Sequence, residues 1–314
     1  MTTATQSSTR PTSTGRTVLH LDGISKSFGA VAALTDISLD VAAGEVVAIV
    51  GDNGAGKSTL VKVLAGVHAA DSGTIVFDGR PVEIPDPGAA ISLGIATVFQ
   101  DLALCENLDV VENLFLGQEL SPYRLDEVEM EKRSWGLLKQ LSARIATVRV
   151  PIASLSGGQR QTVAIARSLL GDPKIIILDE PTAALGVAQT AEVLDLIERV
   201  RERGLGVLMI SHNMEDVRAV ADRVVVLRLG RNNGVFDVGT VSSDQIVAAI
   251  TGATDNVVSR RAARRGGHVE PVEQPAGTAV GGAPGAPGTP VAPVARVGAA
   301  HLAGIPIQEA DTRD

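Results

Sequence analysis

One glycine-rich stretch sets the architecture of this chain: Gly51-Asp52-Asn53-Gly54-Ala55-Gly56-Lys57-Ser58-Thr59. An apolar, β-branched run precedes it at 46–50 and a second apolar run follows at 60–64, so the sequence predicts a strand, a tight loop and a helix. Three glycines let the backbone take conformations that a Cβ forbids, and the following helix directs the positive end of its dipole at the loop. The stretch therefore predicts an anion-binding cradle.

The spacing of Lys57 and Ser58 makes this cradle specific for nucleotide phosphates. In the pattern G-x-x-x-x-G-K-[ST], the lysine reaches the β- and γ-phosphates and the hydroxyl ligates Mg²⁺. The alternative is an ordinary glycine turn with a chance lysine. Because a strand is predicted before the loop and a helix after it, the sequence favours a phosphate-binding loop, or P-loop, with ATP and Mg²⁺ as its ligands.

Composition limits the classes of protein that this chain can represent. Its 314 residues are 45% hydrophobic, which is enough for a full core. A net charge of −8 argues against a general nucleic-acid binder, which needs a basic surface, so no nucleic-acid partner is expected. Cys105 is the single cysteine, so no internal disulfide is possible, as in a reducing cytosol. No apolar run approaches the roughly 20 residues that span a bilayer.

Shifts in composition predict one folded domain between two disordered ends. Residues 1–16 are rich in Ser and Thr and lack periodicity, and from residue 253 the chain is rich in Ala, Gly and Pro. Residues 17–252 form the predicted domain, which begins with short alternating segments typical of an antiparallel β subdomain. Residues 101–154 show helical periodicity, including Trp135, Leu138 and Leu141, and are predicted to form a helical insertion between two strands.

The second half of the domain alternates between predicted strands and helices. Apolar runs at 175–178, 207–210 and 224–229 are predicted strands, and 230–234 is predicted to be a turn. The intervening helices are expected at 188–203 and 214–221, with a closing helix at 244–250. Such alternation is typical of an α/β fold whose core is a mainly parallel sheet.

Acidic and basic side chains follow two of these strands. Asp179 and Glu180 come directly after the run at 175–178, and His212 comes after the run at 207–210. Ligands of open α/β sheets bind at the carboxyl ends of strands, so Asp179 is suited to the Mg²⁺ shell and Glu180 to polarising water as a general base. His212 can donate to the γ-phosphate. The alternatives, a solvated strand end and a structural histidine, are weaker because a P-loop lies upstream.

A second glycine-containing helix start lies at Leu155-Ser156-Gly157-Gly158-Gln159. Ser156 is placed as the N-cap of a predicted helix over 160–170, and the two glycines make another anion cradle. A protein chain that binds one ATP needs only one such cradle for its phosphates. The alternative is a merely flexible loop.

Taken in order, these elements resemble the ATP-binding subunit of an ABC transporter over residues 17–252. In that resemblance Gln100 is the Q-loop glutamine, expected to contact Mg²⁺ and assist catalysis, and Phe28 is the aromatic that stacks on adenine. From the residues alone, Phe28 could equally make a small core or turn contact. The resemblance implies a P-loop NTPase cassette that pairs head to tail with a second copy. Ser156, Gly157, Gly158 and Gln159 of one copy then close over the ATP held by Lys57 of the other.

Within the family, the segments 98–104 and 111–117 are similar to those of importers of monosaccharides. A single P-loop and a single LSGGQ stretch resemble the single-cassette branch, which pairs as a homodimer. This resemblance implies a peripheral subunit on the cytoplasmic face of the membrane. Its expected partners are transmembrane permease subunits and, indirectly, a sugar-binding protein.

Two departures from the family pattern keep other classes open. Gly186 stands where the loop after Glu180 usually has an aspartate, and the segment 144–151 lacks the usual lead into the LSGGQ stretch. A soluble ABC ATPase acting on ribosomes or DNA is one alternative, although two cassettes or a long coiled-coil insertion would be usual there. A regulatory cassette that binds ATP without turnover is the other, and Glu180 and His212 argue against it.

Overall fold

The computed structural model describes residues 15–121 and 123–253. The chain divides into two units, Met1–Gly267 and His268–Asp314, and every described residue belongs to the first. The predicted disordered ends are residues 1–16 and 253–314. They lie outside the described residues, except for Gly15, Arg16 and Ala253.

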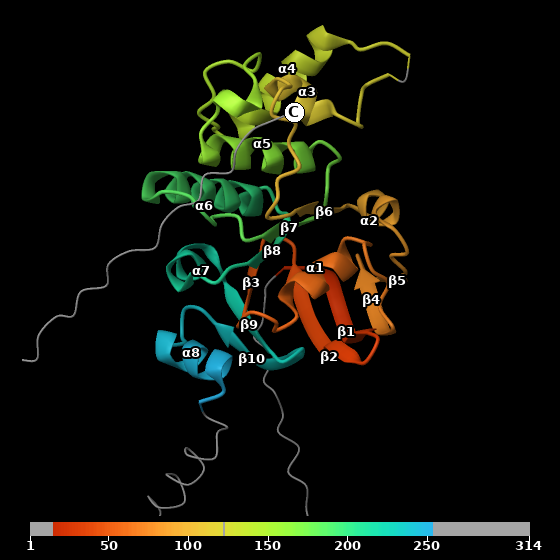
Figure 1. The fold of residues 1–314 in the computed structure, drawn as a ribbon, viewed down its shortest axis with the longest axis vertical. Coiled ribbons are helices and arrows are strands. Elements are labelled where there is room, and N and C mark those ends of the chain that lie inside the picture. The colour runs from red at the N-terminus through yellow and green to blue at the C-terminus, as the bar shows by residue number, and fades with distance from the viewer. Residues whose placement is uncertain (1–14, 122, 254–314) are drawn as a thin grey trace, which may run out of the picture. The chain divides into compact units, whose positions relative to one another are not determined.

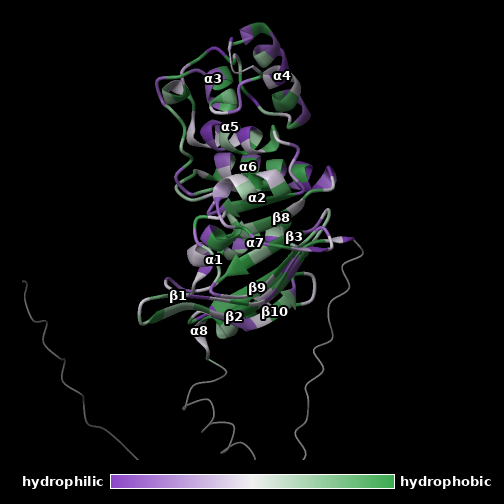
Figure 2. Ribbon diagram, turned by 90° about the vertical axis from the view of Figure 1, so that its right-hand side faces the viewer, coloured by the Kyte–Doolittle hydropathy of each residue, from purple (hydrophilic) through white to green (hydrophobic). Residues whose placement is uncertain are grey.

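Six of the described strands form the central sheet, in the order β10-β9-β3-β8-β7-β6. The five strands from β9 to β6 are parallel and β10 pairs antiparallel with β9. Their bounds are β3 Val46–Val50, β6 Ile95–Val98, β7 Ile175–Asp179, β8 Gly206–Ile210, β9 Arg223–Arg228 and β10 Arg231–Asp237. The central strands are apolar and buried, as expected for a parallel sheet covered on both faces (Figure 2).

One face of this sheet is covered by helices. Side chains of α5 Gly157–Leu169, α6 Val187–Glu202, α7 Met214–Val220 and α8 Ser243–Thr251 share a buried cluster with the alternate residues Val46, Ala48 and Val50 of β3. The apolar spacing in α6, at Val193, Leu196, Ile197 and Val200, gives the stripe that a helix needs to bury one side.

The other face packs against α1 Lys57–Leu64 and a second sheet (Figure 1). Within the described residues this sheet has the order β2-β1-β4-β5, all antiparallel, with bounds β1 Thr17–Phe28, β2 Val31–Ala42, β4 Ser72–Phe77 and β5 Arg80–Val82. Arg223 of β9 joins the two sheets by donating to the Glu45 carboxylate and the Asp40 carbonyl. The predicted antiparallel β subdomain is present, and β4 and β5 add to it after the P-loop.

Helix α2, Pro87–Leu93, precedes β6. The insertion after β6 contains two helices, α3 Val110–Phe115 and α4 Glu127–Gln140. Buried Asn113 organises the start of the insertion, because its side chain bonds both the N–H and the carbonyl of Cys105. The predicted apolar face of α4 is wrong at Trp135, which is 40% exposed, whereas Leu138 and Leu141 are buried. Ser134 takes the inward position instead and bonds the Met130 carbonyl.

The predicted turn over 230–234 is also wrong, because most of that stretch belongs to β10. The chain reverses at Leu229 and Gly230, whose φ angles are +49° and +74°. Positive φ at both central residues is typical of the two-residue turns that join antiparallel strands. Asn232, a residue that usually marks turns, instead bonds the backbone of Ser38 in β2 through both its side-chain atoms. That long-range contact compensates for its poor strand propensity.

Candidate nucleotide-binding and catalytic site

The P-loop joins β3 to α1 at the carboxyl edge of the sheet. Gly56 is the N-cap residue of α1 and has a φ of +102°, which favours glycine. A Cβ on Gly51 would lie 2.2 Å from the Leu227 carbonyl oxygen, so the backbones of loop and β9 meet too closely for any side chain. No side chain of the described residues caps α1. Its first-turn N–H groups therefore lack a side-chain acceptor, as a phosphate-binding helix end requires.

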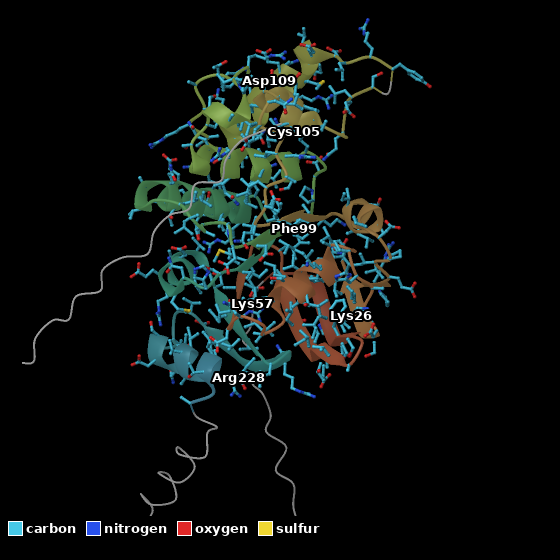
Figure 3. All side chains as sticks on the ribbon, in the orientation of Figure 1. Lys26, Lys57, Phe99, Cys105, Asp109 and Arg228 are labelled. Atoms are coloured by element: carbon cyan, nitrogen blue, oxygen red, sulfur yellow. The ribbon has the colours of Figure 1, made fainter. Side chains whose placement is uncertain are left out.

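The Lys57 ammonium lies inside this loop. Its Nζ donates to the carbonyl oxygens of Gly51 at 2.6 Å and Asp52 at 3.1 Å, and the residue is buried where β3 meets α1 (Figure 3). Ser58 and the loop tip 52–54 are exposed, whereas Ala55 is buried and Thr59 is partly buried. The structure thus brings a buried cation and an exposed hydroxyl to the edge where the sequence predicted phosphate and Mg²⁺.

Asp179 ends β7 near the same loop. Burial, followed by the negative charge of Glu180, raises the pKa of the Asp179 carboxyl, and the ammonium groups of Lys57 and Lys62 act in the opposite direction. The lysines therefore only partly offset the cost of a desolvated carboxylate beside a like charge. A cation bound near Asp179 would remove that cost.

Glu180 and His212 contact each other across neighbouring strands. His212 Nδ1 lies 2.7 Å from Glu180 Oε2, and because a carboxylate only accepts, Nδ1 carries the proton of this hydrogen bond. The Glu180 side chain is 15% exposed and the His212 side chain 72%. Glu180 has a φ of +52°, and its N–H donates to the Ile210 carbonyl of β8 at 3.0 Å. The sequence placed both residues at this edge but did not predict that they pair.

The LSGGQ stretch forms the N-terminus of α5, which begins three residues before the predicted start at 160. Ser156 Oγ accepts from the Gln159 N–H at 3.3 Å and Gln159 Oε1 accepts from the Ser156 N–H at 3.0 Å, so the two form a capping box. Gly157 and Gly158 pack against the loop after β7 and against α6, where a Cβ on them would lie 2.9 Å from Leu185 and 3.1 Å from Gln189.

These two helix ends lie apart in the chain. Helices α5 and α1 pack on opposite faces of the central sheet, and Figure 1 draws them apart. The structure brings together Lys57, Asp179, Glu180 and His212, and it leaves the four predicted residues of the LSGGQ stretch elsewhere. Gln100 is exposed and lies two residues after the end of β6, the neighbour of β7, so it lies at the same edge as Asp179.

Phe28 ends β1 and is 44% exposed. Its ring meets His68 edge-on, with centroids 5.1 Å apart, and Lys26 Nζ lies 5.7 Å from its centroid. Neither contact places the ring in the core, which favours a surface role. The sequence did not predict the contacts of His68 and Lys26 with Phe28, because no local pattern around either residue indicates them.

Two further residues at the site were also missed. Thr182 Oγ1 donates to Asp216 Oδ2 at 2.6 Å and so joins the loop after Glu180 to α7. An aspartate in the first turn of a helix is an ordinary capping residue, so the sequence carried no signal for this contact. Gly186, the departure from the family pattern, is the N-cap residue of α6, and a Cβ there would meet no described atom within 4 Å.

Within the described residues there is neither a metal-binding cluster of side chains nor a membrane-spanning helix. Over 15–121 and 123–253, no three or more His, Cys, Asp or Glu side chains gather as a metal site. No helix in the same ranges is long and apolar enough to cross a membrane.

A P-loop, an acidic strand end and a histidine at one edge of a parallel sheet define a P-loop ATPase of the α/β class. The family described as ABC transporter matches residues 34–183. The chain is 46% identical to the xylose/arabinose import ATP-binding protein of Sulfolobus acidocaldarius, over 68% of this chain and 86% of that protein. It is 41% identical to the fructose import ATP-binding protein of Rhizobium meliloti, over 76% and 95%. The chain belongs to the ABC transporter family and is an ATPase.

Other comparisons agree with this assignment. The ribose import ATP-binding protein of Clostridium perfringens is 38% identical over 76% of this chain, which spans only 48% of that relative. A solved ATP-binding cassette of an ABC transporter in its ADP conformation has a TM-score of 0.67 and 27% identity, over 76% of this chain and 99% of that structure. The predicted family and the predicted fold class are both confirmed.

Proposed function

We propose that this chain hydrolyses ATP at the carboxyl edge of β3, β7 and β8, with Glu180 as general base. The observation that carries this is the 2.7 Å contact between Glu180 and His212, next to the buried Lys57 ammonium. His212 fixes the orientation of the Glu180 carboxylate through one oxygen, which leaves the other for the attacking water. Lys57 would move from the carbonyls of its own loop to the β- and γ-phosphates when ATP binds, since phosphate is the stronger acceptor.

The residues at this edge also fit Mg²⁺. This ion is commonly held by one or two protein carboxylates together with substrate phosphates and water, so a dedicated protein cage is not needed. The Ser58 hydroxyl and the Asp179 carboxylate would be its protein ligands, with Gln100 beside them. The raised pKa of Asp179 supports this role, because a buried carboxylate beside a like charge gains from a nearby cation. When bound, Mg²⁺ would neutralise charge on the phosphates.

The second cradle supports a dimer of this chain. Since α5 and α1 pack on opposite faces of the central sheet within one chain, the capped end of α5 would face the γ-phosphate on a second copy. A solved ATP-binding cassette with 27% identity and a TM-score of 0.60 was obtained as a dimer bound to ADP and Pi, and the alignment covers 70% of this chain and 98% of that structure. We assign Ser156, Gly157, Gly158 and Gln159 to ATP contacts across such an interface, and Phe28 to the adenine.

The transported substrate of the whole assembly is proposed to be a sugar. The relatives named above are import ATP-binding proteins for xylose and arabinose, fructose and ribose. By this proposal the chain sits at the cytoplasmic face of the membrane, with a permease and indirectly a sugar-binding protein. A mainly apolar groove of about 260 Å³ between β6 and α5, lined by Thr97, Phe99 and Arg167, opens beside Gln100 and would suit a permease segment.

Steady-state ATP hydrolysis, measured with and without membranes carrying the cognate permease, tests the proposal. Turnover that rises with the permease, together with sugar-dependent uptake, is expected. The second candidate is a regulatory cassette without turnover, which the missing carboxylate at Gly186 favours. Tight ATP binding with no hydrolysis under any of these conditions would select that candidate, and uptake of peptides or metals would refute the sugar proposal.

A further inference from the structure

A buried carboxylate contacts the two loops that carry Glu180 and His212. Asp216 of α7 is 4% exposed, and both of its oxygens accept hydrogen bonds from side chains. Thr182 Oγ1 donates to Oδ2 at 2.6 Å and Asn213 Nδ2 donates to Oδ1 at 3.0 Å. Two donors that converge on one site need two acceptor atoms, and aspartate supplies them where asparagine would supply one.

The two donors belong to the two loops that carry Glu180 and His212. Thr182 lies two residues after Glu180, in a turn closed by the bond from the Ala183 N–H to the Glu180 carbonyl at 3.1 Å. Asn213 directly follows His212 and caps α7 by accepting from the Glu215 N–H at 2.9 Å. Through its two hydrogen bonds, Asp216 therefore links the loop after β7 to the loop after β8.

We infer that Asp216 and Thr182 are positioning residues that hold Glu180 and His212 within hydrogen-bonding distance of each other. This rests on the proposed roles of Glu180 and His212. His212 is mostly exposed and Glu180 has a backbone conformation with positive φ, so neither side chain is held by burial alone. The Thr182–Asp216–Asn213 chain supplies the missing constraint, since two hydrogen bonds to the buried Asp216 carboxylate hold both donors in place.

A purely structural role for Asp216 is the competing explanation, because an acid in the first turn of α7 also stabilises the helix through its dipole. Substitutions at Thr182 separate the two. Thr182→Val keeps the shape and removes the donor to Asp216, Thr182→Ser restores the donor, and neither changes α7. Thr240→Val is the matched control, because that exposed threonine bonds only the Asp237 carbonyl in the turn before α8.

The experiment measures kcat and KM for ATP on the full-length variants, with Asp216→Asn as a second probe and Glu180→Gln as a benchmark. We expect Thr182→Val and Asp216→Asn to lower kcat about tenfold or more with KM unchanged, since small misplacements of catalytic groups are costly. Thr182→Ser should recover kcat, and Thr240→Val should have the kcat of the parent. Because Thr182 and Asp216 act through one contact, the double variant Thr182→Val/Asp216→Asn should lose no more kcat than Asp216→Asn alone.

Wild-type kcat in Thr182→Val would overturn the inference, and so would equal losses in Thr182→Val and Thr182→Ser. If Glu180→Gln itself turns over normally, the proposed role of Glu180 fails first. A dead Glu180→Gln enzyme alongside an unaffected Thr182→Val enzyme would refute the positioning role alone.

Discussion

The two glycine-containing helix starts of this chain look alike in sequence but are built differently. The N-cap of α1 is Gly56, in a left-handed conformation, and no described side chain caps that helix. The N-cap of α5 is Ser156, whose capping box with Gln159 satisfies two backbone donors internally. Helix ends without a cap leave N–H groups that need an outside acceptor, whereas a capping box does not.

This difference indicates separate tasks for the two ends. The end of α1 gains most from a phosphate, and Lys57 already lies inside its loop. The end of α5 is complete in the single chain and presents Ser156 at an exposed position. We therefore expect α1 to bind ATP in one chain alone, and α5 to contact that ATP only when a second chain arrives.

Glu180→Gln should give the largest effect, because the amide keeps the shape of the side chain but takes no proton from water. Turnover should fall by about a thousandfold, within the range usual for general-base loss, while ATP stays bound. Hydrolysis and ATP binding are measured on the same preparation. Retained turnover would remove Glu180 from the mechanism, and lost binding would mean that its role is not catalytic.

Lys57→Ala removes the cation from the α1 end. We expect ATP affinity to fall about 100-fold, as for the loss of a buried charged partner worth about 3 kcal/mol. Titration calorimetry measures it. Lys62→Ala, on the exposed side of the same helix, is the control and should bind within a few-fold of wild type. Unchanged affinity in Lys57→Ala would contradict the P-loop assignment.

Ser156→Ala and Ser242→Ala break matched capping boxes, since Ser242 caps α8 with Gln245 in the same way. Each should lower the free energy of unfolding by about 1 kcal/mol. Only Ser156→Ala should also lower turnover, because only that serine is assigned to ATP. Thermal unfolding and ATPase assays on both variants decide it. Equal turnover in the two would leave Ser156 with a capping role and nothing more.

Asp179→Asn should give the smallest effect, and its sign depends on pH. A carboxyl whose pKa is raised on folding favours the fold below its unfolded pKa of 3.8 and loses that contribution as the pH rises through the raised value. At neutral pH the buried charge is a cost, so the variant without nucleotide should melt about 2 °C higher. The advantage should vanish toward pH 4, and Mg-ATP should stabilise the variant less than it stabilises the parent. A lower melting temperature at pH 7 would contradict the assigned burial cost.

Local patterns were enough to predict much of the fold and of the site. The P-loop, the strand before Asp179 and the strand before His212 each carry their signal within ten residues. The helix α2 could also have been predicted, since Asp86 caps it and Pro87 occupies its first position. Strand β10 could not, because Asn232 is stabilised there by Ser38, nearly 200 residues away. The Thr182–Asp216 contact and the pairing of Glu180 with His212 depend on strand order, which no single segment specifies.

Mixing two double variants tests the shared site most directly. Glu180→Gln/Lys57→Ala keeps the α5 end but should stay without ATP at a concentration below its roughly 100-fold weakened Kd. Glu180→Gln/Ser156→Arg binds ATP at that concentration but has its α5 end blocked. Neither should dimerise alone with Mg-ATP at tens of micromolar. Native mass measurement of the mixture should reveal a heterodimer with one ATP per two chains, held between Lys57 of one and Ser156 of the other. A mixture that stays monomeric, or a dimer of the Ser156→Arg variant alone, would contradict the account.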